Sequence, residues 1–419
     1  MPATARPTQA HSHAGGPAGA KPKLYNPRHP ERTLLYQTIA EHFETWFELA
    51  SAGQFDGQGD HHSPRPYVRQ AFRKYLECGI FAHGFARAWC DDCGHDYFVA
   101  YSCKGRGVCP SCNTRRMVET AAHLCDHVFP RLPVRQWVLS VPKRLRYFMQ
   151  RDGAVLNMVL RIFLRVIAQS LQTHSPGAAN VDKATLHIGA VAFIHRFGSS
   201  LNAHVHFHVC VVDGVFEEIP VAVVGQTDVQ SSPPGIVFHP ASAIDETAVA
   251  QVQTDLRRRI LRAFVGRGLI EKADAKEMLA YQHSGFSVDA GVCIEAPDRA
   301  ALERLLRYCA RSPFAMDRLR KEGAALVYRL RLRQIHVAHT GDAEQIAQRT
   351  PAGAGFELDL HTSSAIAFCA HAANGSTRID NARATDLRRI NVHSAHVECA
   401  QVATFLVANS TDTADSPNR

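Results

Sequence analysis

The chain has 419 residues. This is too long for a single ordinary hydrophobic core, so we expect two or three domains. Hydrophobic residues make up 46% of it, which is normal for a globular protein. Lysine and arginine outnumber aspartate and glutamate by 47 to 39, and this basic balance favours a polyanionic partner. The most apolar run, residues 154–168, carries Asn157, Arg161 and Arg165 at four-residue spacing. This spacing is typical of an amphipathic helix, so we expect no membrane partner and a cytoplasmic protein.

The N-terminal quarter begins with a leader and continues with helices. Residues 1–25 are rich in Ala, Pro, Gly and His without apolar periodicity, which predicts disorder. Apolar residues at helical spacing predict a helix over 31–50, and a second helix is expected over 67–78. With the cysteine motif that follows, residues 26–120 are predicted to form a small helical and zinc-binding domain.

Two Cys-x-x-Cys pairs, separated by 15 residues, are the strongest signal in this region: Cys90, Cys93, Cys109 and Cys112. Four thiolates at such spacing close a tetrahedron around Zn²⁺ and leave no position for a substrate, so the zinc should be structural. Cys103, between the pairs, and His83 are alternatives for one ligand. No secretory signal peptide precedes the cysteines, which favours reduced thiols over disulfides.

A basic collar surrounds the second cysteine pair, formed by Lys104, Arg106, Arg115 and Arg116. Such a cluster can contact the phosphates of DNA. It can equally be a solvated surface, and the sequence leaves both interpretations open.

Residues 121–332 predict an α+β domain built on an antiparallel sheet. A helix near 118–128 precedes a buried strand over 136–141, and the amphipathic helix follows. Two strands, 185–197 and 204–216, are then joined by a short loop. A strand, a helix and an antiparallel hairpin in this order are typical of an α+β fold.

The second strand of this hairpin carries a row of histidines. His204, His206 and His208 alternate with Val205 and Phe207. Because successive side chains of a strand point to opposite faces, the three imidazoles share one face. Imidazoles held on a stiff strand are suited to bind a divalent ion, although a lone His-x-His is more often a polar strand face.

A tyrosine on a later helix is the candidate nucleophile. Asp298 can cap this helix and the Ser312-Pro313 pair ends it. Helical spacing places Tyr308 beside Arg304 and Arg311, whose positive charge would favour a phenolate and stabilise charge on a phosphate. A tyrosine at the edge of a buried stripe can also serve packing alone.

The order of several motifs resembles the insertion-sequence-91 family: residues 101–104, 109–112, 196–202, 204–208, 213–215 and 307–313. These are rolling-circle transposases that carry an HUH endonuclease domain, named for His, bulky hydrophobic residue, His, behind a zinc-binding domain. The similarity covers roughly residues 30–330. It implies a metal-dependent tyrosine endonuclease and transposase that nicks and transfers single-stranded or hairpin DNA at the ends of an insertion sequence.

The resemblance also implies residue roles. Tyr308 would attack one DNA strand, leaving a 5′-phosphotyrosyl link and a free 3′-hydroxyl. His206 and His208, or His204 and His206, would bind Mg²⁺ or Mn²⁺; phenylalanine as the bulkier spacer favours the first pair, with His204 as a third ligand. No ligand from outside the strand can be identified in the sequence. Arg304 and Ser312 stand four residues from Tyr308, which indicates a single-tyrosine form.

The last segment, residues 333–419, is an Ala-, Thr- and His-rich run of poor periodicity in which the resemblance is expected to fail after about Arg331. Our hypothesis is a divergent, frame-shifted or disordered tail, which a protease would remove before the core. Two other functions stay open: a replication-initiator or mobilisation nickase of the same chemistry, and an inactive DNA-binding remnant.

Overall fold

A computed structural model of the chain describes the greater part of it. The described residues are 28–53, 64–89, 94, 96–105, 107–198, 202–219, 235–242, 244–281, 285–323, 325–330, 356–360 and 402–407. The predicted leader therefore lies outside the described residues, as do Cys90, Cys93 and Arg106.

The described chain contains helices together with runs of consecutive antiparallel strands, as in an α+β fold. The helices are α1 (Leu34–Ser51), α2 (Pro66–Glu77), α3 (Pro110–His123), α4 (Lys143–Arg151), α5 (Gly153–Thr173), α6 (Glu246–Gly266), α7 (Lys272–Ala280) and α8 (Arg299–Ala310). The strands are β1 (Phe85–Trp89), β2 (Asp96–Ala100), β3 (Val134–Ser140), β4 (Leu186–Phe197), β5 (Ala203–Val212), β6 (Gly214–Ile219), β7 (Gly235–Pro240), β8 (Ser287–Ile294), β9 (Leu319–Glu322), β10 (Ala325–Leu330), β11 (Phe356–Leu360) and β12 (Val402–Val407).

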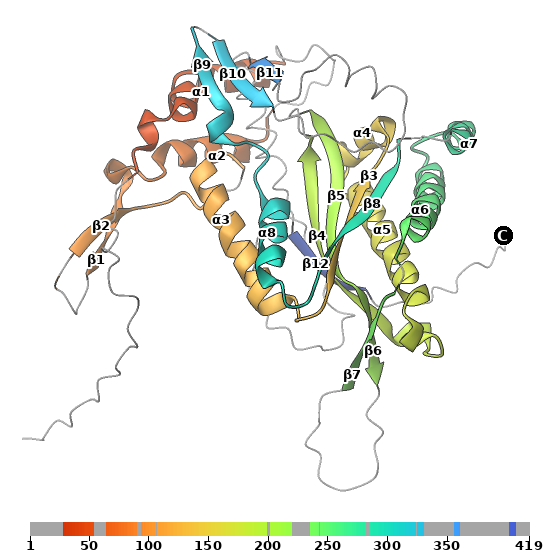
Figure 1. Ribbon diagram of the computed structural model, residues 1–419. Coiled ribbons are helices and arrows are strands. Elements are labelled where there is room, and N and C mark those ends of the chain that lie inside the picture. The colour runs from red at the N-terminus through yellow and green to blue at the C-terminus, as the bar shows by residue number, and fades with distance from the viewer. Residues whose placement is uncertain are drawn as a thin grey trace, which may run out of the picture.

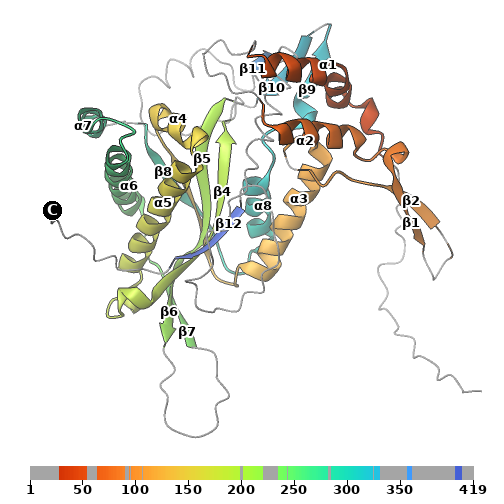
Figure 2. The same ribbon diagram turned by 180° about the vertical axis from the view of Figure 1, so that it is seen from behind.

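The largest described sheet has seven strands and forms the centre of the molecule. Its path runs β7-β6-β4-β5-β3-β8, with β12 added to β4, and its pairings are antiparallel. Helices α4, α5 and α6 lie on one side of it, and α3 and α8 lie on the other (Figure 1). Figure 2 shows the same two layers from behind. The predicted α+β fold with an antiparallel sheet is confirmed.

Strand β5 explains why the two layers differ in chemistry. Val205 and Phe207 point into the larger core together with the apolar side of α5, where Phe163 lies 6.4 Å from Phe207 between ring centroids. The alternate residues, which include the three histidines, therefore point toward the layer of α3 and α8. The alternation in the sequence thus places the histidines on the side of the sheet that faces α3 and α8.

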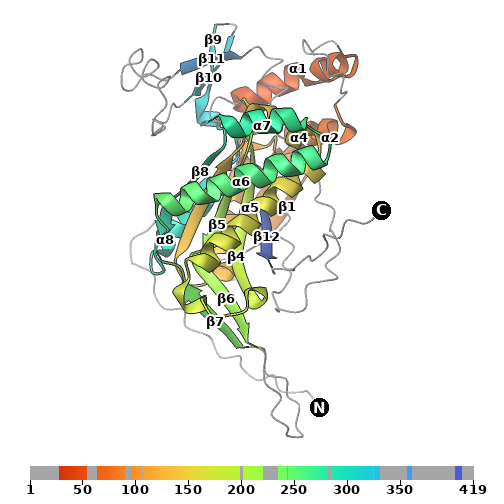
Figure 3. The same cartoon turned by 90° about the vertical axis from the view of Figure 1, so that its right-hand side faces the viewer.

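Helix α5 is long and apolar enough to cross a membrane by length and composition alone. Eleven of its residues are buried, and it lies against the sheet beside α6 (Figure 3). Its apolar side belongs to the largest core cluster of the described residues. The amphipathic core helix expected from the sequence accounts for this pattern.

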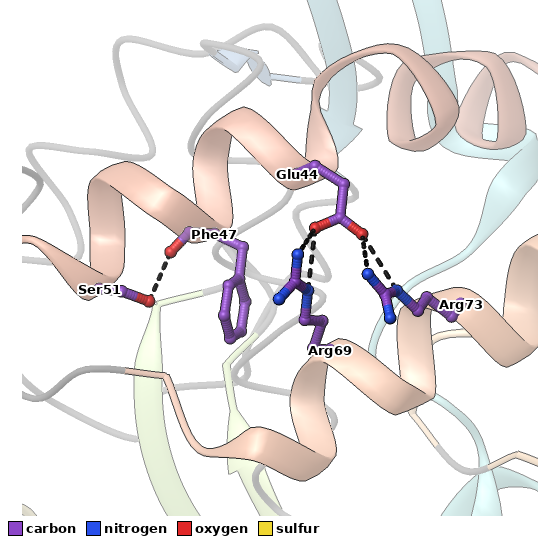
Figure 4. Close-up of polar contacts among 5 residues, drawn as sticks. All are labelled: Glu44, Phe47, Ser51, Arg69 and Arg73. Atoms are coloured by element: carbon purple, nitrogen blue, oxygen red, sulfur yellow. Dashed lines mark hydrogen bonds and ion pairs between the residues drawn. The ribbon is translucent and has the colours of Figure 1, made fainter.

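The N-terminal helices pack as an antiparallel pair. Phe43 of α1 stacks on Phe72 of α2 with 4.2 Å between ring centroids. On the outside of the pair, Glu44 accepts hydrogen bonds from Arg69 at 2.6 Å and 2.9 Å and from Arg73 at 3.1 Å (Figure 4). Because these charges are exposed, the stacked rings, and not the ion pairs, carry most of the stabilisation.

Residues that follow the central sheet in the chain return to this N-terminal core. Strands β9, β10 and β11 form a small antiparallel sheet near α1 (Figure 1). Tyr328 of β10 is fully buried in the same cluster as Phe43 and Phe72, and it stacks on Phe314 at 4.9 Å. The linear boundary expected near residue 120 is therefore crossed, since residues before and after it share one core.

Part of the predicted tail is described as strand. Strand β11 pairs with β10, and β12 pairs with β4 from Ile188 to Phe193. These two segments are thus joined to the sheets by backbone pairing rather than lying apart from the fold. The remainder of residues 333–419 lies outside the described residues.

A buried ion pair holds the turn that follows β5. Arg135 of β3 donates to both carboxylate oxygens of Asp213, at 2.9 Å and 2.7 Å, and to the carbonyl of Ala290 in β8 at 3.1 Å. We expect Asp213→Ala to lower the free energy of unfolding by about 3–5 kcal/mol, because a buried guanidinium would lose its partner. Chemical denaturation measures the change. The exposed Arg115 and Glu119 pair is the control: Glu119→Ala should cost about 0.5 kcal/mol or less.

Candidate functional site

Four cysteine thiols lie together in the N-terminal region: Cys78, Cys103, Cys109 and Cys112. Cys78 follows α2, Cys103 lies in the loop after β2, and Cys109 caps α3, which contains Cys112. The sulfur atoms of Cys78 lie 3.7 Å from Cys112 and 3.6 Å from Cys109. Cys103 and Cys112 are 3.5 Å apart.

These distances fit a structural zinc ion. A tetrahedron with zinc–sulfur bonds of about 2.3 Å has sulfur atoms about 3.8 Å apart, close to the observed spacing. Cys109 and Cys112 are buried, so solvent cannot take a ligand's place there. Hydrogen bonds from Cys103, Cys109 and Cys112 lower the pKa of the Cys78 thiol, which favours the thiolate that a metal requires.

The cysteine set differs from the predicted one at two positions. Cys109 and Cys112 take part as expected, and Cys103 was considered as a substitute ligand. Cys78 was missed, because it follows a helix and has no Cys-x-x-Cys partner to mark it. Four thiols complete a tetrahedral site without Cys90 and Cys93, which lie outside the described residues.

The predicted basic collar is only partly brought together. Arg116 donates to the carbonyl of Lys104 at 3.2 Å, so these two residues are neighbours. Arg115 is exposed and donates to Glu119 at 2.6 Å, which engages its charge. Lys104 is also exposed, with a φ of 48° that a non-glycine residue rarely adopts.

Three imidazoles converge on the face of the sheet that α8 covers: His195, His206 and His208, with ligand atoms within 4.8 Å of one another. His206 and His208 come from β5, and His195 comes from β4. Ring centroids of His195 lie 5.0 Å from His206 and 4.4 Å from His208. His204 lies at the outer end of the row, where its Nε2 is 3.5 Å from the Ser140 hydroxyl. The structure thus groups the pair His206 and His208 with His195, an imidazole from the neighbouring strand.

A β-bulge explains why His195 is missed by sequence reasoning. At the hairpin end Phe197 pairs with Ala203, and continuing this register would place His195 opposite Val205 on the apolar face. The register shifts between His195 and Phe197, so that His195 pairs with His206 instead. One extra residue in a strand turns the following side chain to the other face. The histidine itself was a signal, but the bulge could not be read from the sequence.

One nitrogen of each imidazole lies within hydrogen-bond distance of a neighbouring group. His195 Nε2 lies 2.7 Å from the carbonyl of Cys309, and His206 Nδ1 lies 2.9 Å from the carbonyl of His204. His208 Nδ1 lies 2.9 Å from the side-chain amide of the buried Gln136. Contacts of this kind fix the orientation of metal-ligating histidines.

The environment keeps the imidazoles neutral. Burial lowers the pKa of His195 to about 4 and that of His208 to about 2, and it also lowers the pKa of His206. Arg311 adds to the effect at His195, His206 and His208 through its positive charge. Neutral imidazole is the form that binds a metal ion, so these groups need no deprotonation near pH 7.

Helix α8 brings Tyr308 to the histidines. The Tyr308 ring lies edge-on to His208 with 5.7 Å between centroids, and the Arg311 guanidinium lies 4.3 Å from its centroid. The next residue, Cys309, is buried and contacts both His195 through its carbonyl and Gln136 through its sulfur at 3.2 Å. Arg304, the other predicted cationic neighbour, is exposed on α8. The predicted tyrosine therefore adjoins the predicted histidines, from residues a hundred positions apart.

The geometry makes a direct prediction for metal binding. Alanine at His195, His206 or His208 should weaken Mn²⁺ affinity by about 100-fold or more, because each removes a ligand atom. His204→Ala should change the affinity by less than about threefold, since His204 lies outside the group. Isothermal titration with Mn²⁺ measures all four variants. A larger loss in His204→Ala than in His208→Ala would assign the pair to the other register.

Comparison with known families identifies the class of the protein. Residues 50–141 match a family model described as "Transposase zinc-binding domain", and residues 189–349 match one described as "Putative transposase". The searches of curated proteins and of solved structures gave no match. The chain is therefore a transposase, with a zinc-binding domain ahead of its transposase domain.

The particular family follows from the zinc-binding domain. Its model is that of the insertion-sequence-91 transposases, and the chain belongs to this family, as the resemblance in its sequence implied. A transposase binds DNA, so the polyanionic partner expected from the basic composition is DNA. The second match continues to residue 349, so the resemblance does not end near Arg331 as expected.

Proposed function

We propose that this transposase acts by metal-dependent, tyrosine-mediated nicking and strand transfer of single-stranded DNA at the ends of an insertion sequence. The observation that carries the proposal is the meeting of Tyr308 with three neutral imidazoles, one buried and two partly buried, on one face of the sheet. A nucleophile beside a ligand set is the arrangement that phosphodiester cleavage through a covalent intermediate requires.

The proposed residue roles follow from the contacts. His195, His206 and His208 would hold Mg²⁺ or Mn²⁺ through one ring nitrogen each, and Gln136 would orient His208. When bound, the divalent ion would act as a Lewis acid on the scissile phosphate and orient it for in-line attack. The thiols of Cys78, Cys103, Cys109 and Cys112 would hold Zn²⁺, whose role is structural.

The reaction at Tyr308 balances as a transesterification. The phenolic oxygen loses its proton and forms a bond to phosphorus, the bond from phosphorus to the 3′ oxygen breaks, and that oxygen takes up a proton, so no proton is gained or lost overall. The products are a 5′-phosphotyrosyl link and a free 3′-hydroxyl. Arg311 stands against the Tyr308 ring, where its charge would stabilise the charge that develops on the phosphate.

A second arginine, Arg146 of α4, lies near the His204 end of the histidine row. Arg146 of α4 donates its Nε proton to the carbonyl of Val141 at 2.6 Å, which fixes the guanidinium. Its charge contributes to the lowered pKa values of His204 and His206, so it lies close to that end of the row. Arg146 and Arg311 would thus contact the DNA backbone on two sides of the scissile phosphate.

The test is a covalent-adduct assay. The protein is incubated with single-stranded oligonucleotides that span candidate element ends, with Mn²⁺ or with a chelator. A protein–DNA adduct that needs the metal, and that peptide mapping places on Tyr308, supports the proposal. Binding without any adduct would instead indicate the inactive DNA-binding remnant.

A further inference from the structure

The β1–β2 hairpin presents a row of exposed aromatic rings that the histidine site does not use. Phe85 is 47% exposed, Trp89 56% and Phe98 47%. We call these residues, with Phe81 beside them, the aromatic platform. In Figure 1 the hairpin projects from the end of α2, apart from the central sheet that carries the histidines.

The strand register places the rings on one face. Phe85, Arg87 and Trp89 alternate along β1, and Phe98 pairs directly with Arg87 across the hairpin. Residues at alternate positions and their direct partners share a face, so the opposite face carries Ala86, Ala88, Tyr97 and Val99. Phe85, Trp89 and Phe98 thus share one face of the ribbon, with Arg87 between them.

The rings are held in place by contacts among themselves. Phe85 lies edge-on to Phe98 at 5.1 Å between centroids, and Phe81 lies at 6.0 Å from Phe85 in a similar way. The Arg87 guanidinium lies 5.8 Å from the Trp89 ring and is fixed by an ion pair with Asp96. Rings that are ordered and exposed lose little conformational entropy when they bind a flat partner.

We propose that the aromatic platform binds unpaired bases of single-stranded DNA by stacking. This inference rests on the proposed function in taking a single strand as the ligand. Aromatic rings with a nearby guanidinium are the groups that bind bases without sequence preference, because every base has a π-face. In duplex DNA those faces are covered by neighbouring bases, so the platform should select single strands.

A protein partner fits this surface less well. A stable protein interface buries about 800 Å² on each side, whereas a ribbon of two five-residue strands offers a narrow surface. The family already gives the chain a DNA partner, and the whole chain carries a net charge of +8. DNA is therefore the occupant to which the chemistry of the platform points.

The experiment measures DNA affinity in a protein that cannot form the adduct. In a Tyr308→Phe background, Trp89→Ala and Phe98→Ala should each weaken binding of a labelled oligothymidylate by about 5- to 100-fold, measured by fluorescence anisotropy. Binding of a labelled duplex should change by less than about twofold. Val99→Ala, an exposed residue on the opposite face of the same hairpin, is the matched control and should leave both affinities unchanged.

Tryptophan fluorescence gives an independent measurement. The chain has three tryptophans, and Trp46 and Trp137 are buried while Trp89 is exposed. Single-stranded DNA should quench the exposed component of the emission, and Trp89→Phe should abolish that quenching while preserving affinity within about threefold.

The outcomes separate this inference from the proposed function. Unchanged affinity in Trp89→Ala and Phe98→Ala, or an equal loss in Val99→Ala, would overturn the platform. A change from dimer to monomer on the same substitutions, seen by light scattering, would overturn it in favour of a subunit interface. If no covalent adduct forms at Tyr308 but binding still depends on Trp89 and Phe98, the nicking proposal fails and the platform stands.

Discussion

Tyr308→Phe is expected to abolish the covalent protein–DNA adduct and to reduce strand cleavage by a factor of about a thousand or more. Phenylalanine keeps the ring that packs against His208 and Arg311 but lacks the attacking oxygen. Single-turnover cleavage of a labelled oligonucleotide, with denaturing gels for the adduct, measures both effects. Because the ring stays in place, DNA affinity should change by less than about twofold.

A matched control separates the nucleophile from a stacked tyrosine in general. Tyr147 also has an arginine over its ring, with Arg151 at 3.7 Å from the centroid, but it is exposed on α4. Tyr147→Phe should form the adduct at the normal rate. Adduct formation that survives Tyr308→Phe and disappears in Tyr147→Phe would place the nucleophile on the other helix.

Replacement of a cysteine in the four-thiol cluster should unfold the N-terminal region. We expect Cys78→Ser and Cys112→Ser to lose bound zinc, because apparent binding energies of structural zinc reach about 10–16 kcal/mol and much of that supports folding. Both sulfurs lie in the core that contains Phe43 and Phe72. Metal analysis by mass spectrometry and thermal unfolding measure the loss.

Serine variants distinguish the predicted zinc ligands from the cysteine cluster of the structure. Cys90→Ser and Cys93→Ser should retain one zinc per chain if the cluster is the zinc site. Loss of that zinc in Cys90→Ser, with retention in Cys78→Ser, would restore the two Cys-x-x-Cys pairs as the ligand set.

Much of the fold could be predicted from local patterns. The alternation of Val205 and Phe207 with the histidines predicted β5, although the single strand expected over 204–216 is divided at Asp213 into β5 and β6. The apolar run at residues 154–168 lies within α5. A half-buried strand and a core helix each have a characteristic spacing of apolar residues, which can be recognised in the sequence. The predicted helix of Tyr308 is likewise present as α8. It begins at Arg299, directly after the expected cap residue Asp298.

Sequence reasoning identified only those residues of the candidate site that belong to a recognisable local motif. His206, His208 and Tyr308 lie together as the resemblance implied. His195 depends on a single-residue bulge, and Cys78 depends on how α2 packs on the loop of Cys103. Both are consequences of tertiary structure, which local periodicity does not encode.

The contact between the N-terminal helices and the later chain is hidden from the sequence for a related reason. Sequence order suggested that the zinc module ends near residue 120, but Tyr328 of β10 is buried among the N-terminal helices. Contacts between segments two hundred residues apart leave no compositional mark at either end. Only the packing shows that the two regions share a core.

Helix α3 has a consequence for how such an enzyme can change over generations. It begins at the cysteine cluster, packs along α8, and its Asn113 donates to Ser312 just after that helix at 3.4 Å. If the N-terminal region were exchanged between related insertion sequences, the contacts that position α8 and Tyr308 would change together with the cysteine cluster. We therefore expect recombination at residue 120 between related transposases to yield inactive hybrids.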